Sequence, residues 1–121
     1  MSVGVVMGIG ALGGLGALAR FALDGAVSEW LGRAFPYGTL AVNLSGALVL
    51  GVLVGATVTP DALRLAGTGF VGAFTTFSTW MLETHRLAED GEAPSAVGNL
   101  VASLVLGIAL AALGRRLGAA L

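Results

Sequence analysis

Four long apolar stretches divide the chain, and none of them contains a formally charged residue. They cover Val3–Ala19, Tyr37–Val58, Leu65–Leu82 and Pro94–Gly114. Each approaches or exceeds the roughly 17–25 residues that a helix needs to cross a bilayer. The chain has 121 residues and a mean hydropathy of +0.93, so little of it remains outside these stretches. We therefore expect an all-α membrane protein, a single domain over residues 1–121 with four transmembrane helices at approximately 3–27, 37–58, 62–87 and 94–116.

The composition argues against nucleic-acid binding, thiolate metal binding and enzymatic activity. The net charge is −1 and no basic block is present, which argues against nucleic-acid binding. The chain has no cysteine, so it has neither disulfides nor thiolate metal sites. Its only histidine, His85, lies at the end of a predicted helix without a nucleophile or metal partner, and we therefore do not expect an enzyme. Because no basic region precedes the first apolar stretch, we expect a retained span and not a cleaved signal peptide.

The arginines are divided equally between the two predicted sides of the membrane. Arg64, Arg115 and Arg116 lie on the side of the amino terminus, and Arg20, Arg33 and Arg86 lie on the other. This tie gives the positive-inside rule no preferred orientation. Either other signals determine one orientation, or both orientations are inserted and an antiparallel dimer becomes possible.

Small residues recur four positions apart within the predicted helices. The sets are Gly4/Gly8 and Gly10/Gly14, Ala47/Gly51/Gly55, and Ser103/Gly107/Ala111. Such stripes let helix backbones approach closely in lipid. We expect Asp24–Phe35 to form the first connection and Thr59 or Asp61 to cap the third helix.

The segment Gly67–Met81 is apolar enough for a membrane, yet four hydroxyl residues interrupt it within five positions: Thr75, Thr76, Ser78 and Thr79. Gly69 and Gly72 weaken regular helix just before them. We predict a break near the middle of this third helix. A break would free carbonyl oxygens at membrane depth, and hard cations accept such ligands. No carboxylate lies nearby in the sequence, which favours a monovalent ion over a tightly held divalent one.

Uncharged donors and aromatic rings accompany this break. Asn43 lies inside the second helix, where its amide either bonds a neighbouring helix or points donors into a pore. Thr39 extends the same face, Ser103 either does likewise from the fourth helix or bonds its own helix, and Thr76, Thr79 and Glu83 form a stripe toward one mouth. Donors together with the positive edges of aromatic rings suit a small anion. Arg20 either snorkels to the interface or makes a vestibule positive.

Three segments together resemble the Fluc (CrcB) family of fluoride channels. They are Gly13–Phe21 (GGLGALARF), Gly38–Gly46 (GTLAVNLSG) and Gly69–Trp80 (GFVGAFTTFSTW), of which the third is the most specific. The resemblance extends over nearly the whole chain. It implies a passive fluoride-selective channel in the cell membrane that lowers cytoplasmic fluoride. It also implies an antiparallel, dual-topology homodimer with two pores and a sodium ion at the subunit interface.

The resemblance also implies roles for single residues. The sodium ligands would be the backbone carbonyls of Gly72 and Thr75 from both subunits. The fluoride pathway would contain the side chains of Asn43, Phe77, Ser78, Thr79, Trp80 and Ser103. Arg20 and Glu83 would lie near the vestibule.

The chain departs from the family pattern at Trp80, where phenylalanine is usual. An indole is larger and brings an N–H donor, so it either binds fluoride, narrows the pore or turns aside. Ala73 also replaces a frequent glycine. The alternative functions are a small dual-topology exporter of organic cations, which needs an acid within the membrane, and a structural membrane subunit whose polar residues only join helices.

Overall fold

The computed structural model describes residues 1–121 and contains only helices. The elements are α1 (Val3–Leu31), α2 (Tyr37–Gly55), α3 (Pro60–Ala62), the π-helix η1 (Leu63–Val71), α4 (Gly72–Phe74), α5 (Ser78–Glu89) and α6 (Ala93–Ala119). Three of them, α1, α2 and α6, are long and apolar enough to cross a membrane. The expected all-α membrane architecture is therefore confirmed.

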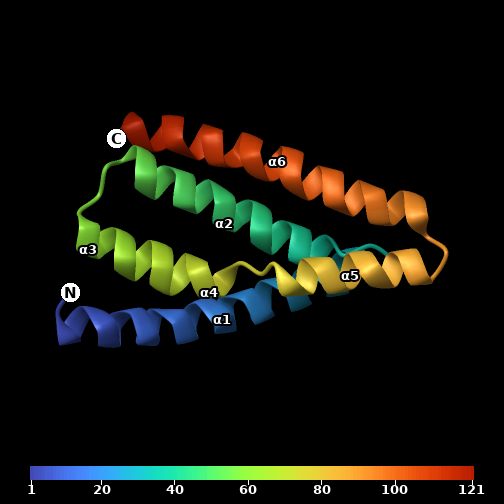
Figure 1. Cartoon of the computed structure of the whole chain (residues 1–121), viewed down its shortest axis with the longest axis horizontal. Helices are drawn as coiled ribbons and strands as arrows, with labels where there is room; N and C mark the ends of the chain where they lie inside the picture. Colours follow the sequence, from blue (N-terminus) through green and yellow to red (C-terminus); the bar gives the residue numbers. More distant parts are fainter.

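The helices lie side by side along one long axis (Figure 1). Both termini and α3 lie at one end, and the connections after α1 and after α5 lie at the other. Arg64, Arg115 and Arg116 thus lie toward the end that holds the termini, and Arg33 and Arg86 lie toward the other end, whereas Arg20 lies inside α1. The most extensive packing joins α2 to α6.

The first helix is longer than expected. Residues 24–31 continue α1 and do not form a connection, because the sequence Asp24–Leu31 contains no proline and consists mainly of residues compatible with a helix. The helix ends at Gly32, whose φ of 84° is easily adopted only by glycine. At the other end of the chain, α6 also runs beyond the expected residue 116 to Ala119. Thr59 caps α3, its Oγ1 accepting from the backbone amide of Ala62 at 3.2 Å, which confirms one of the two expected caps.

Close glycine contacts join α2 to α6. A Cβ at Gly51 would collide with the carbonyl of Ala111, and one at Gly114 with the carbonyl of Leu48. The predicted stripe on the second helix is confirmed. On α6, however, Gly107 meets nothing within 4 Å. Of the predicted residues on α6, Ala111 meets Gly51, and the other close contacts with α2 lie at Gly114, Arg115 and Gly118.

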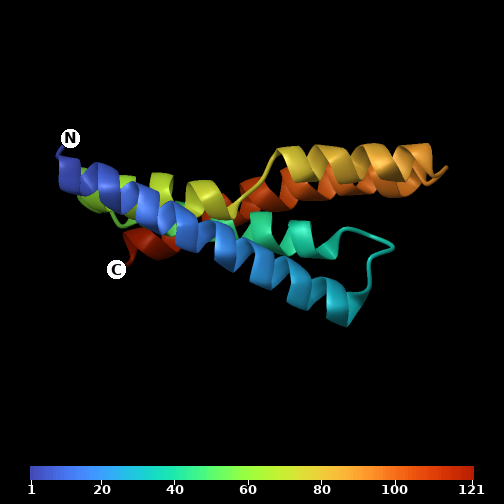
Figure 2. The same ribbon diagram turned by 90° about the horizontal axis from the view of Figure 1, so that it is seen from below.

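The third apolar stretch changes its packing partner along its length. Residues 60–74 are helical from α3 through η1 to α4, and here η1 and α4 pack against α1. Residues 75–77 are not helical, and Thr75 is extended with φ −82° and ψ 160°. After them α5 packs against α6. Figure 2 shows the C-terminal half of α1 diverging from α5 and α6 beyond this point.

Candidate functional site

The non-helical residues 75–77 are held by the side chain of Asn43 on α2. Its Nδ2 donates to the carbonyl of Thr76 at 2.9 Å, and its Oδ1 accepts from the amide of Thr76 at 2.8 Å. An asparagine amide offers both a donor and an acceptor, so it can replace both bonds that a helix would give one peptide residue. Of the two roles open to Asn43 from the sequence, the bond to a neighbouring segment is present, and Nδ2 keeps a second N–H that this bond does not use.

Two carbonyls lose their helical donors at this interruption. In a continuous helix the amide of Thr76 would donate to Gly72, but here it donates to Asn43. The amide of Thr79 would donate to Thr75, but it donates to Oγ1 of Thr76 at 3.2 Å. The carbonyl groups of Gly72 and Thr75 are therefore available to another ligand.

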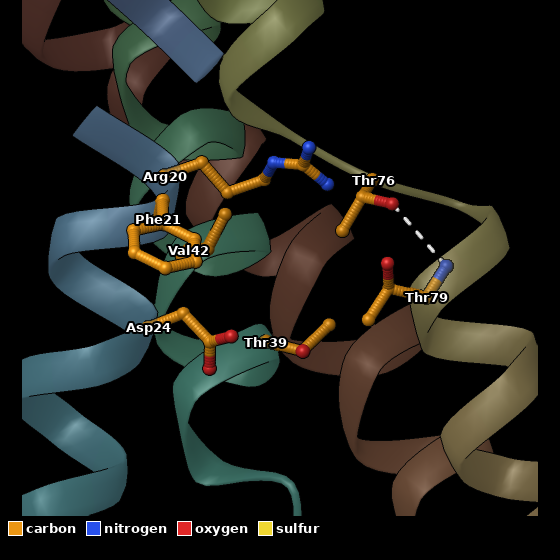
Figure 3. Close-up of a pocket in the computed structure, with 7 residues that line it drawn as sticks. All are labelled: Arg20, Phe21, Asp24, Thr39, Val42, Thr76 and Thr79. Carbon is orange, nitrogen blue, oxygen red and sulfur yellow. Dashed lines mark hydrogen bonds between the residues drawn. The ribbon is translucent and has the colours of Figure 1, made fainter. Parts of the chain in front are cut away.

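A polar cavity of about 210 Å³ lies beside the interruption, between α1, α2 and the first turn of α5 (Figure 3). It is lined by Arg20, Phe21, Asp24, Thr39, Val42, Thr76 and Thr79. The guanidinium of Arg20 extends toward Thr76 in this view. The two salt bridges of the chain join Arg64 to Asp61 and His85 to Glu89, so the charge of Arg20 is not neutralised by an ion pair.

Three charged residues near the cavities lie inside helices, and of these Asp24 was expected in the first connection. Arg20 and Asp24 lie within α1 and not at its end, because the helix continues to Leu31. Glu83 likewise lies within α5. Asp24 accepts a hydrogen bond from the hydroxyl of Ser28 at 3.3 Å and lines the cavity. The cavity thus holds one cation, one carboxylate and several hydroxyl groups.

The two predicted aromatic residues form a pair. The rings of Phe77 and Trp80 lie 5.6 Å apart between centroids and are nearly perpendicular at 81°, so the edge of one faces the other. Both line a second depression of about 260 Å³, together with Asn43 and Thr75. Phe77 is 69% exposed in the single chain, so its ring is free to face an ion, lipid or another subunit.

The remaining predicted residues are more dispersed. Ser78 is exposed and its hydroxyl lies 3.5 Å from that of Thr76. Ser103 lies on α6 outside both cavities, with a buried hydroxyl that has no hydrogen-bond partner. Glu83 lines a smaller cavity of about 150 Å³ with Arg33 and Arg86, toward the mouth formed by the loops.

Sequence reasoning missed Asn99. It lies on α6, is 1% exposed, and its Nδ2 donates to Oγ1 of Thr84 at 2.8 Å. The backbone carbonyl of the same residue accepts from Nε1 of Trp80 at 3.3 Å. The signal was present in the sequence, because an amide inside an apolar stretch is the feature that singled out Asn43.

Comparisons with known proteins agree with these motifs. The family model described as CrcB-like protein, Camphor Resistance (CrcB), matches residues 7–115. A protein of Mycobacterium bovis named fluoride-specific ion channel FluC 2 is 54% identical over 115 residues, which are 95% of this chain and 91% of the relative. A Geobacter metallireducens protein named fluoride-specific ion channel FluC is 45% identical over 114 residues, which are 90% of this chain and 92% of the relative. The chain therefore belongs to the CrcB family.

Proposed function

We propose that this chain forms a passive, fluoride-selective ion channel in the cell membrane and lowers cytoplasmic fluoride. The observation that carries the proposal is the 54% identity, over 95% of the chain, to a protein named fluoride-specific ion channel. A channel forms and breaks no covalent bond, so the chain needs no catalytic residues.

The polar groups at the interruption support passage of a small anion. Thr39, Thr76 and Thr79 bring hydroxyl donors to one cavity, where the guanidinium of Arg20 offers an anion further N–H donors on the side toward Thr76, next to the carboxylate of Asp24. Asn43 lies behind the same peptide with one N–H to spare. In this proposal fluoride exchanges part of its hydration shell for these donors and for the ring edges of Phe77 and Trp80. Ser78 and Ser103 extend the donor track, and Glu83 lies near its mouth.

The exposure of the chain supports an antiparallel homodimer. In one copy Phe77 and Ser78 are exposed, and Thr75 and Thr76 are only half-buried. Exposed polar backbone is costly against lipid tails, and a second copy would cover it. The equal division of arginines permits both orientations. A two-fold axis in the membrane plane would then bring the two interruptions together.

A structural sodium ion fits the same arrangement. The carbonyls of Gly72 and Thr75 have lost their helical donors and are hard oxygen ligands. No cluster of three or more His, Cys, Asp or Glu side chains could hold a metal ion, so a cation here would depend on backbone ligands. Bound sodium would supply positive charge that holds two such carbonyl sets together.

An exporter of organic cations needs an acid within the membrane. Asp24 lies inside α1 and lines the cavity, so the charges alone do not argue against this alternative. The relatives argue against an exporter instead, since proteins that are 54% and 45% identical to this chain carry the name of a fluoride channel. A purely structural subunit would not need an unpaired arginine beside a row of hydroxyl groups.

Fluoride efflux from liposomes that contain the purified protein tests the proposal. We expect fast, passive efflux that requires no proton gradient and strongly favours fluoride over chloride. Chloride flux equal to that of fluoride, or no flux from verified dimers, would reject the channel. Proton-driven uptake of an organic cation would instead identify an exporter.

A further inference from the structure

A buried polar network joins α5 to α6 next to the aromatic pair. The hydroxyl of Thr84 donates to the carbonyl of Trp80 at 2.8 Å and accepts from Nδ2 of Asn99 at 2.8 Å. The indole of Trp80 donates to the backbone carbonyl of Asn99 at 3.3 Å. These three bonds form a closed loop in which both the main chain and the side chain of Trp80 are tied to one residue of α6.

In this network the indole N–H of Trp80 already has an acceptor. An indole has a single N–H donor, and here it is directed to the main chain of α6. It is therefore not available to an anion in the depression that Trp80 lines. What the indole can offer on that side is its ring, which meets Phe77 edge to face.

The side chains of Asn99 and Thr84 are both buried, which favours this one pairing of donors and acceptors. Asn99 is 1% exposed and Thr84 is 9% exposed, so water does not readily replace either partner. A buried amide that loses its partner is costly, and the donor of Asn99 has Thr84 as its partner in this structure. This network thus fixes the position and rotation of the first turn of α5, which carries Trp80 and directly follows Phe77.

We propose that Asn99 is a positioning residue of the ion pathway. It holds the Trp80 indole with its N–H turned away from the permeating ion, and through the indole it orients the exposed ring of Phe77. This inference rests on the proposed channel function and extends it to a residue on α6 that does not itself line the aromatic depression. It also assigns Trp80 a ring contribution and not a hydrogen bond to fluoride.

The test combines indole hydrogen exchange with fluoride flux in the reconstituted protein. The chain has two tryptophans, so a Trp30→Phe background leaves Trp80 as the only one. Trp30 is 83% exposed near the end of α1, so this replacement should disturb the packing little. In this background the Trp80 indole N–H is followed by nitrogen-15 NMR. Asn99→Ala keeps the backbone carbonyl that accepts the indole N–H and removes the bond from Nδ2 to Thr84, which holds α5 against α6. We expect the loosened α5–α6 contact to speed indole exchange by up to about tenfold, the scale of the lost Asn99–Thr84 bond, and to lower fluoride flux. In a Trp80→Phe protein, Asn99→Ala should lower flux much less, because the side chain through which it acts is gone.

A matched pair at Thr84 keeps the test valid if Asn99→Ala does not fold. Thr84→Val removes the hydroxyl with little change in shape and should reproduce both effects, whereas Thr84→Ser should restore slow exchange and flux. Unchanged indole exchange in Asn99→Ala and Thr84→Val, or an equal loss of flux with and without Trp80, would overturn the positioning role. Absence of flux in the unmutated protein would instead reject the channel proposal, and the pathway role of Asn99 with it.

Discussion

Replacing Asn43 with alanine tests the central contact of the site. The change removes two bonds, of 2.9 and 2.8 Å, and leaves both the N–H and the C=O of Thr76 without that partner. An unpaired buried polar group costs about 1–3 kcal/mol, so two cost about 2–6 kcal/mol. Asn43 is only half-buried, which allows partial solvation, and we expect a loss near the lower limit, about 2–3 kcal/mol.

The loss is measured as the free energy of unfolding in detergent micelles, beside fluoride efflux from liposomes. Efflux should fall at least about tenfold, because a released peptide no longer holds the donors of Thr76 and Thr79 in place. Ser45→Ala is the matched control, since its hydroxyl bonds only the carbonyls of Ala41 and Val42 in its own helix. The reasoning is refuted if Asn43→Ala stays within about 0.5 kcal/mol of the parent and conducts normally, as expected only for a surface substitution.

Three further predictions follow from the geometry. Phe77→Ile should sharply reduce fluoride flux while changing stability by less than about 1 kcal/mol, because the ring is 69% exposed; an equal loss of both would make it a packing residue. Gly51→Ala should destabilise the chain by about 1–3 kcal/mol in thermal unfolding, because a Cβ meets the carbonyl of Ala111, whereas Gly25→Ala, with open space around it, should not; similar midpoints for the two would contradict the α2–α6 packing. Arg20→Gln should lower fluoride flux most at low ionic strength, whereas a loss independent of salt would exclude an electrostatic role.

The all-helical architecture was predictable because lipid imposes it. A charge-free stretch of about 20 residues must satisfy its backbone bonds internally, and helices do so in a single segment. The location of the candidate site around Thr75 and Thr76 was also predictable, since hydroxyl groups and glycine at membrane depth disfavour a regular helix. The end of the first helix was less predictable, because hydropathy falls at Arg20 while helix propensity continues to Leu31.

By itself, then, the sequence determined the helical class, the family and the neighbourhood of the site, because each depends on local composition or on short motifs. Only the tertiary structure decided which partner each polar group takes. The pairing of Asn43 with Thr76 joins residues 33 positions apart, and that of Trp80 with Asn99 joins α5 to α6. Such contacts depend on helix rotation and register, which close glycine packing sets and which no single helix encodes.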